Sequence, residues 1–341
     1  MAVAQGADVR LSDTVPGWKR RLARAARYED LSLVLFFALV VGFFLIFEPS
    51  AREPRIYPDL LRDTSPHLLT GIGMTLLLLA GQLDLSVGAM LALTGVVTVD
   101  VFNRTDNMWL GIIAGLLTGP IVGAIHGYLV TVQGMDSLMT TLGSMFTIRG
   151  LVYVYTDKAP ITDENGFKSF NKLWNGDIGP LPVPGVIAIV LIALAYILLT
   201  RTEFGRNIYA IGGNKQAARV SGIPVRRITF TLFVISGTLA ALSGLLIASQ
   251  TSTGYFDAGV QGFELIVIAS VVLGGVSLAG GEGRLISAMI GVLILGMTGK
   301  GLRLMNVHTT QQLVVTGVLM LMAVYYHRMR KQLVLRSRDW T

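Results

Sequence analysis

Asp84 places a carboxyl group inside a long apolar stretch, in the run Gly-Gln-Leu-Asp-Leu-Ser-Val-Gly that spans residues 81–88. A charge in a membrane interior costs about 2.5–3.5 kcal/mol on insertion scales, so such residues normally face a bundle interior or a cavity. Asp84 could carry a proton, or Asp84 and Ser86 could cap the exposed end of a broken helix, one of them as N-cap of the next span. We favour capping, because Asp-x-Ser-x-Gly is typical of a helix junction and a lone carboxylate without a basic partner gives little support to a proton relay. Gln82, Asp84 and Ser86 are therefore candidates for a pathway or gate.

A second unusual run lies between residues 271 and 284, where five glycines stand within the ten positions from Gly274 to Gly283. Glycine destabilises a helix interior, so this composition predicts irregular backbone or a tight turn. Irregular backbone at membrane depth is tolerated only where protein or a water-filled cavity covers it. Gly274 and Gly275 are thus further candidates for the pathway wall, with a plain glycine turn as the equally good alternative.

The segment 201–227 is polar and cationic, set between two long apolar runs, with Glu203 as its one acid. The excess of Arg and Lys predicts that it lies in the cytoplasm. Asn214 is a good N-cap, Gly222 can take the left-handed position after a helix, and Pro224 prevents continuation. We expect a short helix by which a cytoplasmic motor subunit moves a transport pathway. The residues expected to make that contact are Gly213, Asn214, Ala217, Ala218, Arg219, Ser221 and Gly222.

The composition is that of a polytopic membrane protein: 341 residues, 52% hydrophobic and 14% charged, with a mean hydropathy of +0.62. The net charge of +7 comes from segments that flank apolar runs, so membrane topology explains it and nucleic-acid binding is not indicated. The absence of cysteine rules out a disulfide framework and a thiol redox site.

Other reactive patterns are weak. His67 and His126 lie far apart without ligand spacing, so a metal site is not expected. The stretch 296–301 lacks the spacing and the Ser or Thr of a phosphate-binding loop, and no soluble nucleotide-binding domain fits in the chain. If ATP drives this protein, another chain must bind it. Arg149 lies within an apolar run, where it could snorkel or pair with a carboxylate such as Asp136.

Apolar runs long enough to cross a hydrocarbon core predict an all-α membrane protein with about ten transmembrane helices. Ten spans from an inside N-terminus put the segment 201–227 and the basic tail in the cytoplasm, together with most of the 28 Lys and Arg residues. We expect a basic leader over 1–30, either an interfacial helix or disordered, a transmembrane domain over 31–327 that includes the cytoplasmic loop 201–227, and a cytoplasmic tail over 328–341. The predicted spans are Leu31–Phe47, His67–Gly81, Leu85–Phe102, Trp109–Val132, Ser137–Tyr155, Val183–Thr200, Ile228–Ser249, Phe263–Gly280, Leu285–Leu302 and Gln312–His327. Residues 70–99 could instead form one continuous helix with Asp84 near its middle.

Three stretches together resemble the permease subunits of bacterial ATP-binding-cassette sugar importers, in the ribose-permease group. They are 81–88, 213–223 and 272–283, and the resemblance extends from about residue 31 to 327. Gln82 departs from the family, which usually has glycine there, and Lys215-Gln216 stands where an acidic residue is common. The first departure weakens any inference of substrate from relatives, and the second bears on which ATPase the loop accepts.

The resemblance implies a ten-helix fold of the cobalamin-importer type (type II-like) in the bacterial inner membrane, with both termini cytoplasmic. It also implies the partners: a second permease chain, two cytoplasmic ATP-binding subunits that hold ATP and Mg, and an extracytoplasmic sugar-binding protein. The chain itself would bind no cofactor and catalyse no reaction, and would move a monosaccharide or polyol by alternating access. Branched-chain amino acids or nucleosides remain the alternative substrates, and a proton-coupled secondary transporter the alternative mechanism.

Overall fold

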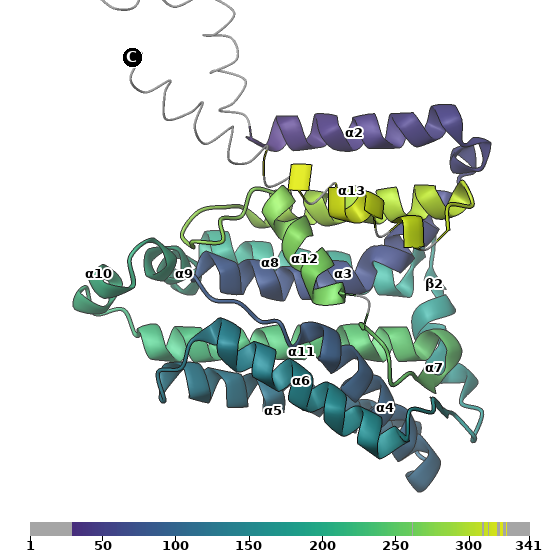
Figure 1. Cartoon of the computed structure of the whole chain (residues 1–341), viewed down its shortest axis with the longest axis horizontal. Helices are drawn as coiled ribbons and strands as arrows, with labels where there is room; N and C mark the ends of the chain where they lie inside the picture. The colour runs from purple at the N-terminus through teal and green to yellow at the C-terminus, as the bar shows by residue number, and fades with distance from the viewer. Residues whose placement is uncertain are drawn as a thin grey trace, which may run out of the picture.

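The computed structural model describes residues 29–260, 262–308, 310–312, 314–318, 321–322 and 325. The described chain is mostly helical, and its long helices lie roughly side by side (Figure 1). Its helices are α2 (Glu29–Phe47), η2 (Pro49–Arg52), α3 (Ile56–Leu79), α4 (Val87–Thr105), α5 (Met108–Thr131), α6 (Ser137–Thr156), α7 (Lys168–Asn175), α8 (Val183–Arg201), α9 (Glu203–Gly213), α10 (Lys215–Val220), α11 (Val225–Thr251), α12 (Phe263–Leu273) and α13 (Leu285–Leu304). Two short antiparallel pairs complete it, β1 (Ile161–Thr162) with β4 (Thr253–Gly254) and β2 (Asp177–Ile178) with β3 (Leu181–Pro182).

Within the described residues, five helices are long and apolar enough to cross a membrane, namely α4, α5, α8, α11 and α13. Each other predicted span up to Leu302 also overlaps a helix, and the break between α3 and α4 confirms the division of residues 70–99. The predicted span 312–327 lies largely outside the described residues. So do the basic leader up to residue 28 and the tail.

Helix α3 begins before the predicted span. The span is predicted to start at His67, whereas α3 begins at Ile56 and contains Pro66. In the first half of α3, Arg62 pairs with Asp59 at 2.7 Å and with Asp177 at 2.6 Å. Partners supplied by tertiary contacts allow polar sequence to remain helical.

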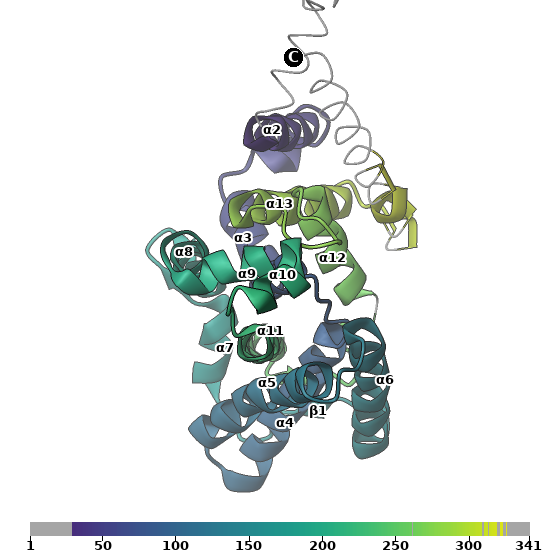
Figure 2. The ribbon, with the colours of Figure 1, turned by 90° about the vertical axis from the view of Figure 1, so that its left-hand side faces the viewer.

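Helix α11 lies at the centre of the bundle, against α3, α4 and α5 (Figure 2). The four-residue glycine period of α5 makes this packing possible, because a Cβ atom at Gly119 would collide with the carbonyl oxygen of Gly237, and one at Gly123 with that of Phe233. Small residues at this spacing let helix backbones approach closely where lipid gives no hydrophobic drive. The result is a rigid α5–α11 pair beside which the candidate site is built.

Candidate functional site

Helices α9 and α10 form a polar hairpin at one end of the bundle, on the left of Figure 1. Asn214 accepts a hydrogen bond from the amide of Ala217 at 2.9 Å, so it is the N-cap of α10, as predicted. Gly222 adopts φ +83° after the helix, also as predicted. Sequence reasoning missed α9, which is capped by Thr202 through a 3.2 Å hydrogen bond from the amide of Gly205. Because α9 ends where α10 begins, the two helices share one short connection.

The predicted contact residues divide by exposure. Gly213, Asn214, Ala217, Arg219, Ser221 and Gly222 are exposed on the surface of the hairpin. Ala218 is only 4% exposed and packs into the hydrophobic core, so it anchors α10 to the chain's own bundle. Val220, which was not predicted, is 84% exposed. An isolated apolar residue within a polar loop is the sequence signal that would have identified it.

The C-terminal end of α9 meets two other segments through backbone. At Gly212 a Cβ atom would collide with the carbonyl oxygen of Leu79 and the amide of Gly281, and that amide donates to the same Leu79 oxygen at 2.9 Å. The Tyr209 hydroxyl donates to the carbonyl of Gly283 at 3.0 Å. Burial raises the pKa of Tyr209, so the hydroxyl stays protonated and able to donate. The end of α3, the end of α9 and the 280–283 loop therefore form one close contact, which we call the glycine junction.

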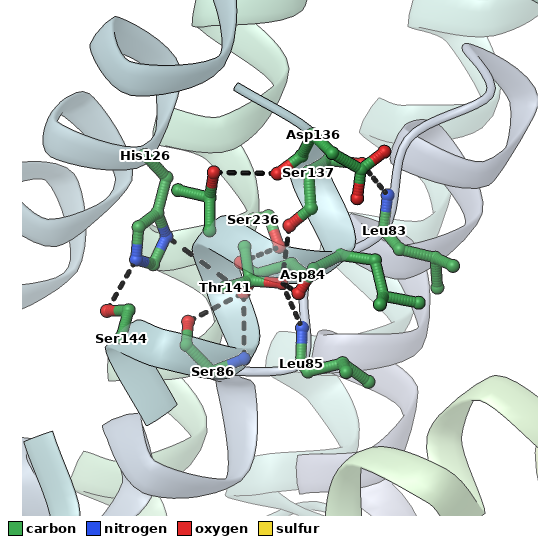
Figure 3. A network of polar contacts seen from close by, with 12 residues as sticks. Leu83, Asp84, Leu85, Ser86, His126, Asp136, Ser137, Thr141, Ser144 and Ser236 are labelled. Atoms are coloured by element: carbon green, nitrogen blue, oxygen red, sulfur yellow. Dashed lines mark hydrogen bonds and ion pairs between the residues drawn. The ribbon is translucent and has the colours of Figure 1, made fainter. Parts of the chain in front are cut away.

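The chain leaving α3 turns at Gly81, with φ +69°, and reaches Asp84, which is 1% exposed. The Asp84 carboxylate accepts from the Ser86 amide at 3.0 Å and the Ser86 hydroxyl at 2.6 Å, and its other oxygen accepts from Ser236 at 3.2 Å (Figure 3). Asp84 thus ties down the start of α4, which supports the capping interpretation. Ser86 stands at the N-cap position but makes no side-chain cap hydrogen bond.

Asp84 also has a basic neighbour that its local sequence does not show. His126 Nδ1 lies 4.0 Å from Asp84 Oδ1, both side chains are 1% exposed, and His126 Nε2 shares a 2.7 Å hydrogen bond with Ser144 (Figure 3). Within the described residues, Nδ1 makes no hydrogen bond. The acid and the histidine come from segments 42 positions apart, so no local motif predicts the pair.

Helix α6 also holds the segment between α3 and α4. The Leu83 amide donates to Ser137 at 3.3 Å and the Leu85 amide donates to Thr141 at 3.0 Å (Figure 3). The Gln82 amide closes the end of α3 by donating to the carbonyl oxygen of Leu77 at 2.9 Å. The backbone of 82–85 is irregular, and hydrogen bonds from the amides of Gln82, Leu83 and Leu85 provide the partners that such backbone needs at membrane depth.

The second predicted glycine pair has two different environments. A Cβ atom at Gly274 would collide with the backbone of Ala288, so this glycine lets the end of α12 pack on α13. Gly275 adopts φ +89° and has open space around its Cα. Gly274 is therefore a packing residue and Gly275 a turn residue.

Arg149 and Asp136 do not pair. The Arg149 guanidinium lies 3.7 Å from Glu264 and donates to the carbonyl of Gly259 at 2.8 Å. Asp136 instead caps α6, accepting from the amide of Met139 at 3.2 Å. The true partner of Arg149 is more than a hundred positions away in the sequence. In the described part of the chain, no group of three or more His, Asp or Glu side chains is placed to hold a metal ion.

Comparison with known proteins gives a consistent result. Residues 56–324 match the family described as "Branched-chain amino acid transport system / permease component". The chain is 39% identical over 283 residues to the ribose import permease protein RbsC of Bacillus subtilis (strain 168), covering 83% of this chain and 88% of the relative. It is 38% identical to RbsC of Escherichia coli (strain K12), covering 92% and 97% of the two chains, and 38% identical to the L-arabinose transport system permease protein AraH of that strain, covering 89% and 92%. No solved structure matches.

The family match spans most of the chain, and these relatives are aligned over nearly their whole length. The chain therefore belongs to this family of transport-system permease components.

Proposed function

We propose that this chain is the transmembrane permease of an ATP-driven, binding-protein-dependent importer of a pentose or hexose, with the α9–α10 hairpin as its contact for a separate ATPase. The chain is a transport component and not an enzyme, since its family consists of permease components. Relatives at 38–39% identity are permeases for ribose and L-arabinose, which supports a sugar as the substrate. A D-allose permease, AlsC, at 38% identity extends that range to a hexose.

The glycine junction is the observation on which the mechanism depends. Gly212 at the end of α9 touches the end of α3 and the 280–283 loop through backbone atoms, with no side chain between them. A displacement of α10 would therefore reach both segments through rigid backbone. Coupling of this kind requires that ATP-bound and ATP-free partners favour different positions of the hairpin.

The assembly we propose contains a second permease chain, two ATP-binding subunits that hold ATP and Mg, and a sugar-binding protein outside the membrane. The chain would span the bacterial inner membrane about ten times in a cobalamin-importer-type bundle, with a permease domain over 31–327, a leader over 1–30 and a tail over 328–341. Both termini and the loop 201–227 would be cytoplasmic. The excess of cations in that loop supports this orientation.

The buried Asp84–His126 pair favours a proton-coupled transporter, because a carboxylate and an imidazole 4.0 Å apart could share a proton. Three hydrogen bonds already hold the carboxylate in place, which favours a positioning role. Branched-chain amino acids are the alternative substrate, from the description of the family.

Uptake by the reconstituted complex tests the proposal. The chain is placed in proteoliposomes with its ATPase and binding-protein partners, and uptake of labelled D-ribose, L-arabinose, D-allose and L-leucine is measured with and without ATP. We expect sugar uptake only with ATP and only with the partners present. Uptake by the chain alone, abolished by a protonophore, would replace this proposal with the secondary transporter, and uptake of leucine alone would replace the substrate class.

A further inference from the structure

A cavity of about 550 Å³ lies away from the α9–α10 hairpin, between α3, α12 and α13. Its lining begins at Asp63 in the first half of α3 and at Arg303 near the end of α13, and extends to Ser270 on α12. From the start of α12 to Ser270 is about 10 Å at 1.5 Å per residue, so the cavity reaches well into the bundle. Its volume falls within the range of about 300–1,000 Å³ that is usual for small-molecule sites.

None of the residues that the sequence indicated for the pathway lines this cavity, which neither Asp84 nor Gly275 reaches. Its polar side chains come from separate segments and include Asp63, His67 and Arg303. Each is unremarkable in its own local sequence, which is why a local reading passed over the site.

The charges at the cavity compensate one another. Asp63 lies 3.0 Å from Lys300 and 3.5 Å from Arg303, so this acid is already occupied by two cations. Asp257 also lines the cavity, so two acids stand at the cavity together with those two cations. An anionic ligand would have to compete with Asp63 for those two cations. An uncharged ligand that both donates and accepts hydrogen bonds could use these polar groups as they stand.

Another part of the lining is aromatic and apolar. The rings of His67 and Phe263 lie 4.4 Å apart at 38°, and Val292 and Leu295 of α13 continue the wall. Sites for small ligands combine an apolar, often aromatic, surface with a few placed polar groups. A sugar ring matches this pattern, because it has C–H groups on its faces and hydroxyl groups at its edges.

Resting on the proposed function, we propose that this cavity is a binding station for the transported molecule, and that it holds an uncharged, polyhydroxylated ligand of monosaccharide size. The charged rim of Asp63, Asp257 and Arg303 meets the hydroxyl groups, and the Phe263 side meets a ring face. The station and the glycine junction lie at opposite ends of the helices α3 and α13. Ligand binding at the station and the motion at the junction are therefore separate steps.

Gly299 allows a direct test, because it lines the cavity and a Cβ atom there meets only the end of the Arg303 side chain, at 3.5 Å. Gly299→Leu fills the cavity without a backbone clash, and leucine is favoured over glycine in a helix. Gly42→Leu in α2 is the matched control, since nothing lies within 4 Å of that Cβ position. We expect Gly299→Leu to lower ATP-dependent uptake of D-ribose by about tenfold or more. ATP hydrolysis by the assembled complex and its yield should match those of the Gly42→Leu complex.

The chain has no cysteine, so a thiol placed at Gly299 would be unique. Gly299→Cys should react with a small thiosulfonate reagent, and D-ribose, L-arabinose or D-allose should slow the reaction while L-leucine should not. Gly42→Cys should react at a rate that no sugar changes. Uptake at the control rate by Gly299→Leu, or no protection by any of the sugars, would overturn the proposed station; protection by L-leucine alone would overturn the ligand class. Labelling does not depend on uptake, so failure of wild-type uptake would count against the importer and leave this test intact.

Discussion

The two ends of this molecule are built in opposite ways. At the glycine junction, Gly212, Leu79 and Gly281 meet through backbone atoms, and the only side-chain bond described above is that of Tyr209. At the cavity, the contacts are made by side chains, in the Asp63–Lys300 ion pair and the His67–Phe263 ring pair. Backbone contacts have little freedom to adjust, which suits transmission of movement. Side chains can rotate to make new contacts, which suits a site that binds and releases a ligand.

The largest loss of stability is expected at Gly281, where a close backbone contact and a left-handed backbone conformation occur at the same residue. Gly281 has φ +73° and a Cβ atom there would lie 2.7 Å from the amide nitrogen of Gly213. Gly281→Val should destabilise the protein by about 3 kcal/mol or more, from left-handed strain and overpacking together. Thermal unfolding in detergent and sugar uptake should both reveal the loss.

Gly275→Ala is the matched variant for that change. Gly275 also has a positive φ, +89°, but no atom lies within 4 Å of its Cβ position. Strain alone should cost about 1–2 kcal/mol. Equal losses in Gly281→Val and Gly275→Ala would show that the close contact at the junction contributes nothing.

Asp84 should give the next largest effect. Asp84→Ala leaves the buried amide of Ser86 without its acceptor, which costs about 1–3 kcal/mol. Asp84→Asn keeps an oxygen that can accept from that amide, so it should retain more stability and more uptake than Asp84→Ala. A complete loss of uptake in Asp84→Asn at undiminished stability would instead indicate that the carboxylate carries a proton.

Features set by local sequence could be predicted, whereas contacts between distant segments could not. The caps of α10 and the break between α3 and α4 follow local patterns, and the structure confirms them. Within the described residues, five of the predicted spans correspond to helices that are long and apolar enough to cross a membrane. The α9 contact with Gly281, the Asp84–His126 pair and the Arg149–Glu264 pair join distant segments and leave no periodic signal. Sequence therefore located the irregular segments, while only the fold showed that they touch.

Substitution of the exposed Val220 should affect binding of the ATPase more than stability of the helix bundle. Val220→Asp replaces an apolar side chain that is 84% exposed with a charged one. Because the position is exposed, the free energy of unfolding should change by no more than about 0.5 kcal/mol. We expect ATPase co-purification and uptake to fall by about tenfold, whereas Val220→Thr, of similar shape, should lose less. Normal co-purification of Val220→Asp with the ATPase would remove this side of α10 from the contact.

A small change in stability is also expected at the cavity. Lys300→Met removes a partner of Asp63, but Arg303 remains 3.5 Å away and the acid is about one-third exposed. Solvent screening should limit the loss to roughly 1 kcal/mol or less, and high salt should reduce the difference from wild type. A loss as large as that of Gly281→Val would show that the cavity end is as rigid as the junction.

The central claim is that movement passes from the hairpin to the bundle through Gly212. Its most direct test is the number of sugar molecules imported per ATP hydrolysed by complexes that carry Gly212→Ala, with Gly42→Ala as control. The added methyl group cannot fit between Leu79 and Gly281, so we predict that Gly212→Ala hydrolyses ATP but imports several-fold less sugar per ATP. The control should keep the wild-type ratio. An unchanged ratio in an assembled Gly212→Ala complex would contradict the claim.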